Sequence, residues 1–452
     1  MAGGYLLIGA PSSGSGKTTV TLALMALLTS EGKKVQGFKV GPDYIDPAFH
    51  HLITGRLSYN LDVWMGNEAD VRQTYLRHSR DADLTLIEGV MGLLDGASPD
   101  SNWGSSAHVA EILNCPILFV LDIRAMARSA SAIVKGFQML VGKADIRAVL
   151  MNRAGSARHA EMVKSAIEEE TGVLCVGYLP DRAEILLPER HLGLITAHES
   201  QDQSWSKMEA ADRLLQEHVD VNQLLHIAEN AQGPAEVTTK IQGAVLTSRP
   251  KVAIACDRAL NFYYPANLDV LTQMGAELLW FRPTFGEGVP LSATHLYLGG
   301  GFPEEYVDEL TQYPDMFCDI YHRIVSAGLP TLAECGGYMF LGEAIWSKGH
   351  RFPMVGAIPM ETEITSSLKA LGYRNITVRQ SGVFPAGSRF RGHEYHHSKI
   401  LQDTGLVPGY EVSSSRTPPI SEGHGVRHLL AGYSHLYFPS CPEAIHAWLK
   451  AQ

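Results

Sequence analysis

The first 180 residues alternate short apolar runs with longer amphipathic stretches, and this alternation is the feature that most restricts the fold. Apolar runs that predict strands occur at residues 5–10, 35–40, 84–90, 117–123, 148–152 and 174–179. Helical patterns lie between them, for example at residues 18–30 and 157–170. Strands that alternate with helices pair in parallel, with helices on both faces of the sheet. The sequence therefore predicts an α/β domain built on a parallel sheet.

The strand pattern restarts near residue 250, with apolar runs at residues 251–256, 277–281, 295–298 and 330–333. Residues 184–230 are less regular, and residues 236–250 are polar and end in Arg249-Pro250. We therefore expect an N-terminal domain at residues 1–235, a linker at 236–250 and a second α/β domain at 251–452. A chain of 452 residues is long enough for two such domains.

Composition excludes several classes of protein. The net charge of −11 argues against nucleic acid as the main partner, because phosphate binding requires a basic face. The six cysteines are scattered without a C-x-x-C pair, so neither a disulfide scaffold nor a zinc site is expected. No basic leader or apolar run near the ~20 residues of a membrane span occurs, and we expect a cytoplasmic protein.

A glycine-rich loop joins the first predicted strand to the first predicted helix. Glycine backbone N–H groups and the helix N-terminus can surround phosphate oxygens, while a lysine reaches the outer phosphates and a threonine hydroxyl can hold Mg²⁺. The strict pattern has glycine where this chain has Pro11, and a simple helix-capping turn is the alternative. The residues expected to bind ATP here are Ser13, Gly14, Ser15, Gly16, Lys17, Thr18 and Thr19.

Other polar residues follow the predicted strands of the first domain. Glu88 ends a strand, where a carboxylate beside a phosphate loop is placed to hold Mg²⁺; a solvated strand end is the alternative. Asn152 also ends a strand and is either an adenine contact or a turn residue. Lys39, Asp43 and Asp46 surround a Gly-Pro turn and either bind Mg²⁺ and an anionic substrate or order that turn.

Asp95 lies in a Leu-Leu-Asp-Gly segment shortly after the strand that ends in Glu88. Aspartate before glycine is typical of a turn, because its side chain accepts hydrogen bonds from nearby backbone. Asp95 is therefore either a turn residue or a substrate contact, and the sequence alone favours the turn.

In the second domain an apolar strand runs directly into Cys335, and two glycines then open a helix. A sharp strand-to-helix turn of this kind exposes a nucleophile. Gly300 and Gly301, which follow another strand, and Gly336 are candidates for the backbone N–H groups of an oxyanion hole. His435, in an apolar segment near the C-terminus, is the candidate base, although a histidine in such a segment is often a core residue.

The segment at residues 393–397 reads His-Glu-Tyr-His-His. It is dense in titratable groups, but this spacing is weak evidence for a metal site. A binding surface for an acidic ligand, with His393 as a contact, is the preferred interpretation, and a solvated loop is the alternative.

Taken together, these segments closely resemble the cobyrinic acid a,c-diamide synthase family. The resemblance covers nearly the whole chain and depends on residues 10–19, 39–47, 88–96, 261–267, 299–304, 334–339 and 392–398. It implies a dethiobiotin synthetase-like P-loop domain and a C-terminal class I glutamine amidotransferase domain. In this family, ammonia from glutamine converts the a- and c-acetate carboxylates of a corrinoid ring to amides through ATP-dependent acyl phosphates.

The resemblance also implies roles for individual residues. Cys335 matches the nucleophile and His435 the base. Lys17, Thr18 and Glu88 match the ATP–Mg²⁺ set, with Asp43 as a further magnesium ligand. The positions near the reacting carboxylates are Asp43, Tyr44, Asp46 and Asp95, together with Lys39.

The chain departs from the broad amidotransferase pattern in two places. The usual Gly-x-Cys-x-Gly reads Ala333-Glu-Cys-Gly-Gly, and the usual His-Pro-Glu reads His435-Leu-Tyr. The carboxylate that completes the catalytic triad is therefore missing from its usual position. We interpret this as weak orientation of the imidazole in a Cys–His dyad rather than as inactivity.

The implied ligands are ATP, Mg²⁺, glutamine and a tetrapyrrole, with a homodimer left open as the assembly. Hydrogenobyrinic acid and nickel-sirohydrochlorin are alternative ring substrates. Alternatives of another kind are a P-loop ATPase switch with an inactive amidotransferase domain, and a synthetase that uses free ammonia only. The sequence alone does not decide among them.

Overall fold

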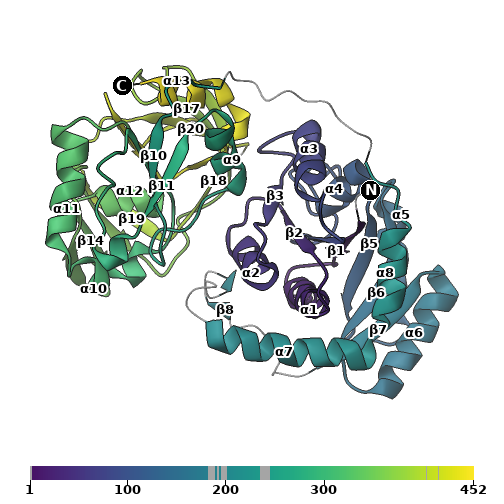
Figure 1. Cartoon of the computed structure of the whole chain (residues 1–452). Coiled ribbons are helices and arrows are strands. Elements are labelled where there is room, and N and C mark those ends of the chain that lie inside the picture. The colour runs from purple at the N-terminus through teal and green to yellow at the C-terminus, as the bar shows by residue number, and fades with distance from the viewer. Residues whose placement is uncertain are drawn as a thin grey trace. The chain divides into compact units, whose positions relative to one another are not determined.

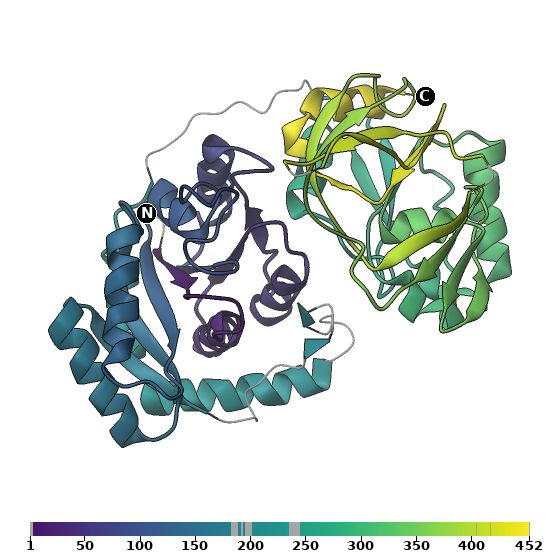
Figure 2. The same cartoon turned by 180° about the vertical axis from the view of Figure 1, so that it is seen from behind.

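The computed structural model describes residues 3–181, 189–190, 193–194, 201–234, 245–403, 405–415 and 417–451. The chain divides into two compact units, Met1–Thr239 and Lys240–Gln452, and each is described by itself. Figures 1 and 2 show their helices and strands from opposite sides. The expected linker at residues 236–250 spans the boundary between the units, and nine of its residues, 236–244, lie outside the described part of the chain.

The first unit contains a parallel sheet of seven strands in the order β3-β2-β4-β1-β5-β6-β7. The α/β fold with a parallel sheet, expected from the alternation of strands and helices, is confirmed. The strands are β1 (Gly4–Gly9), β2 (Val35–Val40), β3 (Tyr59–Leu61), β4 (Leu84–Glu88), β5 (Pro116–Asp122), β6 (Asp145–Ala154) and β7 (Leu174–Pro180).

Helices cover both faces of this sheet and enclose two apolar cores. One core contains residues from α3 (Glu68–His78), α4 (Ser106–Leu113), α5 (Ser129–Leu140) and α6 (Ala157–Thr171). The other contains residues from α1 (Lys17–Ser30), α2 (Ile45–Thr54), α7 (Gln201–His218) and α8 (Val221–Glu229). Strands buried on both faces are rich in apolar residues, which explains why the sequence predicts six of these seven strands. The exception is β3, which is only three residues long.

The irregular region expected at residues 184–230 differs from the structure, because α7 and α8 occupy much of it. A short strand pair, β8 (Glu189–Arg190) and β9 (Gly193–Leu194), precedes them. The apolar residues of α7 and α8 pack into the core on the α1 side of the sheet. The N-terminal end of α7 contains few apolar residues, so the pattern of apolar runs does not predict this helix.

The second unit is built around a six-stranded sheet in the order β11-β10-β12-β13-β23-β22, in which only β22 is antiparallel to its neighbour. Its strands are β10 (Lys251–Ala255), β11 (Glu277–Phe281), β12 (His295–Leu298), β13 (Thr331–Glu334), β22 (His424–Val426) and β23 (Leu429–Gly432). The accompanying helices are α9 (Pro265–Gln273), α10 (Val307–Leu310), α11 (Pro314–Tyr321), α12 (Gly336–Leu341) and α13 (Pro442–Lys450).

Two further sheets extend the second unit. One contains β14 (Ala344–Ser347), β15 (His350–Pro353), β16 (Met360–Ile364) and β19 (Ser398–Asp403). The other contains β17 (Ala370–Val378), β18 (Arg389–His396), β20 (Tyr410–Ser413), β21 (Ile420–Glu422) and β24 (His435–Leu436). The second of these sheets brings β18 and β24 side by side, which places His393 opposite His435. Among the described residues, no helix is both long enough and apolar enough to cross a bilayer.

Candidate active sites of the two units

The phosphate loop of the first unit lies between β1 and α1, as expected from the sequence. Gly16 has a φ of 102°, and a Cβ atom at this position would lie 2.1 Å from the Asn152 side chain, so only glycine fits there. Lys17 donates hydrogen bonds from its ammonium group to the Ser12 carbonyl (3.1 Å) and the Met91 carbonyl (2.6 Å). These two carbonyls hold the ammonium at the loop where the outer phosphates of a nucleotide would bind.

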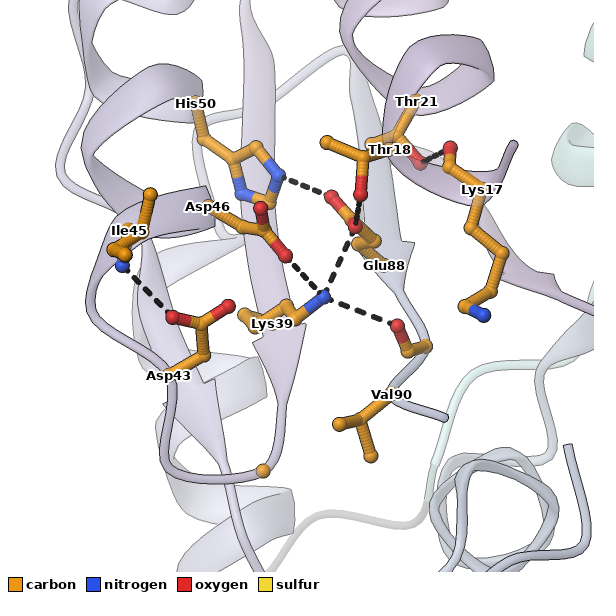
Figure 3. A network of polar contacts seen from close by, with 12 residues as sticks. Lys17, Thr18, Thr21, Lys39, Asp43, Ile45, Asp46, His50, Glu88 and Val90 are labelled. Carbon is orange, nitrogen blue, oxygen red and sulfur yellow. Dashed lines mark hydrogen bonds and ion pairs between the residues drawn. The ribbon is translucent and has the colours of Figure 1, made fainter. Parts of the chain in front are cut away.

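A buried polar network lies beside this loop and is centred on Glu88 (Figure 3). Glu88 Oε1 accepts hydrogen bonds from Thr18 Oγ1 (2.5 Å) and Lys39 Nζ (2.9 Å), and Oε2 lies 2.9 Å from His50 Nε2. Lys39 Nζ also lies 2.5 Å from Asp46 Oδ2. The carboxylate of Glu88 therefore joins the P-loop, β2 and α2 at one point.

The charges in this network support one another. Burial opposes ionisation of Glu88, but the ammonium of Lys39 and hydrogen bonds from His50 and Thr18 hold the pKa of Glu88 below its usual value. Burial and the nearby Glu88 charge raise the pKa of Asp46 well above its usual value, although Lys39 opposes this rise. The carboxylates of Asp46 and Glu88 outweigh the burial of Lys39 and raise the pKa of its ammonium group. Glu88 and Lys39 therefore form a buried ion pair in which each charge stabilises the other.

The structure separates the residues expected to contact substrate into two groups. Lys39 and Asp46 are only 4% and 8% exposed and belong to the Glu88 network. Asp43 and Tyr44 are half-buried, and Asp43 Oδ1 accepts the Ile45 N–H at the start of α2 (2.9 Å). Lys39 and Asp46 are therefore buried in the network, whereas Asp43 and Tyr44 are partly exposed to solvent.

Asp95 and Asn152 both make backbone contacts. Asp95 Oδ2 accepts the Gly92 N–H (2.8 Å), as in a turn, while the residue itself is exposed. Asn152 is buried, and its Nδ2 donates to the Ser15 carbonyl (2.9 Å). The next residue, Arg153, donates from its guanidinium to the Gly14 carbonyl (2.9 Å) and to Asp122 Oδ2 (2.6 Å). The ends of β5 and β6 thus hold the phosphate loop in place.

In the second unit, Cys335 occupies the expected turn between β13 and α12. Its φ of 46° and ψ of −104° are rarely adopted by a residue with a side chain, and such backbone strain is typical of a nucleophile elbow. The Cys335 N–H donates to the Gly432 carbonyl (2.8 Å), which ties the turn to β23. Burial, and secondarily the Glu304 carboxyl, raise the pKa of the thiol well above its usual value. The resting sulfur is therefore a neutral thiol.

The glycine loop at residues 299–301 lies between the nucleophile and the histidine. A Cβ atom on Gly300 would lie 2.3 Å from His435 Cε1, and one on Gly336 would lie 2.8 Å from the Gly301 nitrogen. The Gly300 N–H donates to the Phe262 carbonyl (3.2 Å), so it points away from the expected oxyanion position. The geometry thus differs from the expectation at Gly300, while the Gly301 and Gly336 nitrogens lie at the turn that carries Cys335.

His435 is 2% exposed, and burial lowers the pKa of its imidazole to about 3. Its Nδ1 atom lies 3.9 Å from Oε2 of Glu334, the residue before the nucleophile. Glu334 accepts hydrogen bonds from the Leu436 N–H (3.1 Å) and the Tyr297 hydroxyl (3.0 Å), and burial raises its pKa to about 8. A carboxyl group therefore faces the imidazole, although the sequence carries none at the usual position.

The His-Glu-Tyr-His-His segment forms the last four residues of β18 and the residue after it rather than a solvated loop. Glu394 accepts from Arg374 Nε (2.5 Å) and lies 3.0 Å from His396 Nε2, while His396 Nδ1 faces the Ser398 carbonyl (2.8 Å). The His396 ring stacks on Tyr433 with 3.8 Å between centroids. His393, expected to contact the ring substrate, thus lies within the amidotransferase unit beside His435.

Several residues at the two sites were missed by the sequence reading: His50, Arg153, Glu304 and Glu334. Glu304 follows the glycine loop, and its Oε2 atom is buried without a hydrogen-bond partner among the described residues. Burial raises the pKa of Glu304 to about 8. The only sequence signal for Glu334 was its position next to Cys335. The signal for His50 was its spacing from Asp46, because the two residues lie one helical turn apart on α2.

Comparison with known proteins agrees with this two-site arrangement. Residues 6–195 match the "CobQ/CobB/MinD/ParA nucleotide binding domain" family, and residues 251–442 match the "CobB/CobQ-like glutamine amidotransferase domain" family. A cobyrinate a,c-diamide synthase from Priestia megaterium is 40% identical over 452 residues, which is 100% of this chain and 97% of the relative. The chain belongs to the cobyrinate a,c-diamide synthase family.

Other members of the cobyrinate a,c-diamide synthase family are nearly as similar. The Picrophilus torridus protein is 38% identical over 99% of this chain and 98% of its own length. The Synechococcus protein is 39% identical over 99% of this chain and 98% of its own length. Family membership makes the chain a nucleotide-dependent, glutamine-hydrolysing ligase that forms amide bonds.

Proposed function

We propose that this protein amidates the a- and c-acetate carboxylates of cobyrinic acid in cobalamin biosynthesis, with ATP as the energy source and glutamine as the nitrogen donor. The observation that carries the proposal is the presence, in one chain, of a strained Cys335 elbow beside His435 and of a P-loop with a buried Glu88–Lys39 pair. Relatives that share 40% and 38% of their residues with the full chain are named for this activity.

In the amidotransferase unit, the Cys335 sulfur attacks the carboxamide carbon of glutamine while its proton passes to His435. The oxyanion that develops is proposed to accept hydrogen bonds from the Gly301 and Gly336 N–H groups, which act without reorganising because the backbone fixes them. His435 then gives the proton to the leaving ammonia, and water hydrolyses the glutamyl thioester to release glutamate and the thiol.

In the synthetase unit, an acetate oxygen of the ring attacks the γ-phosphorus of ATP, and ADP leaves. Ammonia then attacks the carbonyl carbon of the acyl phosphate and displaces inorganic phosphate, which leaves the amide. Lys17 is proposed to bind the transferred phosphoryl group, and Asp43 and Tyr44 to position the carboxylate. The buried Lys39 ammonium keeps Glu88 ionised, and Asp46 holds that ammonium in place through an ion pair.

The residues around Glu88 fit a magnesium ion that accompanies ATP. Thr18 Oγ1 and Glu88 Oε1 are hard oxygen ligands that converge beside the P-loop, and Asp43 is a third candidate. Among the described residues, no group of three or more His, Cys, Asp or Glu side chains is arranged to hold a metal alone. Phosphate oxygens and water would therefore complete the coordination, and bound Mg²⁺ would neutralise charge on the phosphates.

The test is a product assay with purified protein, ATP, Mg²⁺ and either glutamine or ammonium chloride. Cobyrinic acid, hydrogenobyrinic acid and nickel-sirohydrochlorin are offered in parallel, and diamides are identified by mass. We expect conversion of cobyrinic acid with both nitrogen donors. ATP hydrolysis without any amide product would instead favour a P-loop ATPase switch.

Two finer features belong to the same proposal. We expect the enzyme to act in the cytoplasm, where glutamine and ATP are abundant, and fractionation of cells that produce it would test this location. A homodimer is the assembly to test, by light scattering at several protein concentrations.

A further inference from the structure

The usual position of the third triad residue, two residues after the histidine, is occupied here by Tyr437. This residue is 3% exposed, and its ring packs edge-on against Tyr264 with 5.8 Å between centroids. An aromatic side chain fixed in the core cannot serve as a counter-charge to an imidazolium. If a carboxylate supports His435, it must come from another element.

We propose that Glu334, at the end of β13, is the positioning carboxylate for His435. It is 1% exposed, and its Oε2 atom lies 3.9 Å from His435 Nδ1. The proposal rests on the proposed function in one respect, that His435 is the base for Cys335. Because Glu334 directly precedes Cys335, one strand end would supply both the nucleophile and the support for its base.

Glu334 is held in place independently of His435. The Tyr297 hydroxyl donates to Oε2 (3.0 Å), and the Leu436 N–H donates to Oε1 (3.1 Å). Asn267 strengthens this arrangement, because its Nδ2 donates to the Leu436 carbonyl (2.8 Å) and its Oδ1 accepts the Phe438 N–H (2.8 Å). The carboxylate and the backbone of β24 are thus fixed to each other, which preorganises the histidine.

A carboxylate near His435 would stabilise the positive charge that the imidazole gains when it accepts a proton. His393 and His396 on β18 oppose a positive charge on the ring, and Glu394 on the same strand favours one. Cys335 is faced by Glu304, Glu334 and Glu394. When His435 accepts the thiol proton, its imidazolium and the carboxylate of Glu334 favour each other's charged forms, so the two groups titrate as a pair.

A half-buried carboxylate, Glu422, provides a matched control. Glu422, on β21, accepts a hydrogen bond from the Tyr433 N–H and another from the Ser434 hydroxyl (3.3 Å). It therefore holds the backbone just before His435, as Glu334 holds the backbone just after it. A loss of backbone support should affect variants of both residues, whereas a loss of the counter-charge should affect only Glu334 variants.

The experiment compares Glu334→Gln, Glu334→Asp and Glu422→Gln in the full chain. Glutaminase kcat and KM are measured, together with the pH dependence of Cys335 alkylation by iodoacetamide, followed on the Cys335 peptide by mass spectrometry. For Glu334→Gln we expect a loss in kcat of about 10- to 100-fold, smaller than the ~10⁴-fold loss when a directly hydrogen-bonded triad acid becomes an amide. The apparent pKa of alkylation should rise, and KM should change little.

Glu334→Asp should restore most of the kcat, because the charge is kept, and Glu422→Gln should lower thermal stability without moving the alkylation profile. A wild-type kcat and profile in Glu334→Gln would overturn the proposal, as would equal shifts in Glu334→Gln and Glu422→Gln. If Glu334→Gln does not fold, Tyr297→Phe replaces it, since it removes the donor that fixes Oε2; an unshifted profile there would also overturn the proposal.

These readouts do not depend on the ring substrate. If the proposed reaction is wrong, neither glutamine nor ammonia yields a diamide from any ring, while the glutaminase and alkylation measurements remain interpretable. If only the role of Glu334 is wrong, diamide formation is intact and the Glu334→Gln profile matches the wild type. The two failures are therefore distinguishable.

Discussion

At the scale of single residues, several charged side chains of the two sites are buried, among them Lys17, Glu88 and Glu334, and burial shifts their pKa values. The Lys17 ammonium has its pKa lowered to about 8, first by burial and then by the Lys39 charge. Glu304 has its pKa raised to about 8 by burial. Side chains poised in this way respond strongly to a charged ligand, because the ligand supplies the missing counter-charge.

Lys17 leads to a prediction about pH. The protonated ammonium binds phosphate, so ATP affinity should be full below pH 8 and should fall, approaching tenfold per pH unit, as pH rises above 8. The measurement is titration with ATP between pH 6.5 and 10, with AMP as a control that lacks the outer phosphates. Equal pH dependence for AMP and ATP would contradict the role of Lys17.

Glu304 leads to a prediction about glutamine recognition. Its buried Oε2 atom lacks a hydrogen-bond partner among the described residues and adjoins the Cys335 site, so we expect it to bind the α-ammonium group of glutamine. Glu304→Gln should raise KM for glutamine about 10- to 100-fold, equivalent to the loss of one charged hydrogen bond of ~1.5–3 kcal/mol. The exposed neighbour Glu305→Gln is the control, and an unchanged KM in Glu304→Gln would refute the assignment.

At the scale of elements, strand ends and the starts of helices carry the chemistry. β1, β2, β4, β5 and β6 all end at one edge of the sheet, where parallel strands bring their carboxyl ends together. Helix α2 then adds Asp46 and His50, which lie one turn apart; His50 contacts Glu88, and Asp46 contacts Lys39 (Figure 3). His50 also lies 2.9 Å from Ser58 Oγ, so it links α2 to Glu88 and to the segment before β3.

This linkage predicts the effect of changing His50. His50→Leu leaves Glu88 Oε2 buried without its donor, so the unfolding free energy should fall by ~1–3 kcal/mol. His50→Gln keeps an N–H donor and should lose less. Urea denaturation measures both, and the KM for ATP shows whether Glu88 has moved. Equal losses in the two variants would mean that packing, not the hydrogen bond, is what His50 contributes.

At the scale of the whole molecule, one chain carries two chemistries that share ammonia. The resting Cys335 site is a neutral thiol near a neutral imidazole, because burial raises the pKa of the first and lowers the pKa of the second to about 3. Such a site is poorly activated until its surroundings change. A glutaminase that stays slow until the synthetase is occupied would prevent waste of glutamine.

We therefore predict slow glutamine hydrolysis by the enzyme alone, with a rise of at least about tenfold, equivalent to ~1.4 kcal/mol in barrier, when ATP, Mg²⁺ and ring substrate are present. Glutamate release is the measurement. Cys335→Ala should abolish this release and glutamine-dependent amidation but retain amidation with ammonium chloride. Equal hydrolysis rates with and without the other substrates would sink the coupling hypothesis.

The sequence by itself determined the features that depend on local pattern. Burial on both faces made six strands of the first unit rich in apolar residues, so that they could be predicted. The loop at Gly14–Gly16 and the turn at Cys335 were predicted from glycines and a nucleophile at strand ends. The motifs also identified the family that the comparisons confirmed. Helix α7 was missed because its N-terminal part has too few apolar residues to reveal a period.

Only the tertiary structure decided how distant residues meet. Glu334 and His435 are 101 positions apart, and Glu88 and His50 are 38 apart, so no local pattern relates them. The Gly300 N–H was expected to face the oxyanion, but a bridge to Phe262 redirects it. The physical reason is that buried charges and N–H groups must find partners wherever the packed chain supplies them, and that supply is set by the fold rather than by neighbours in sequence.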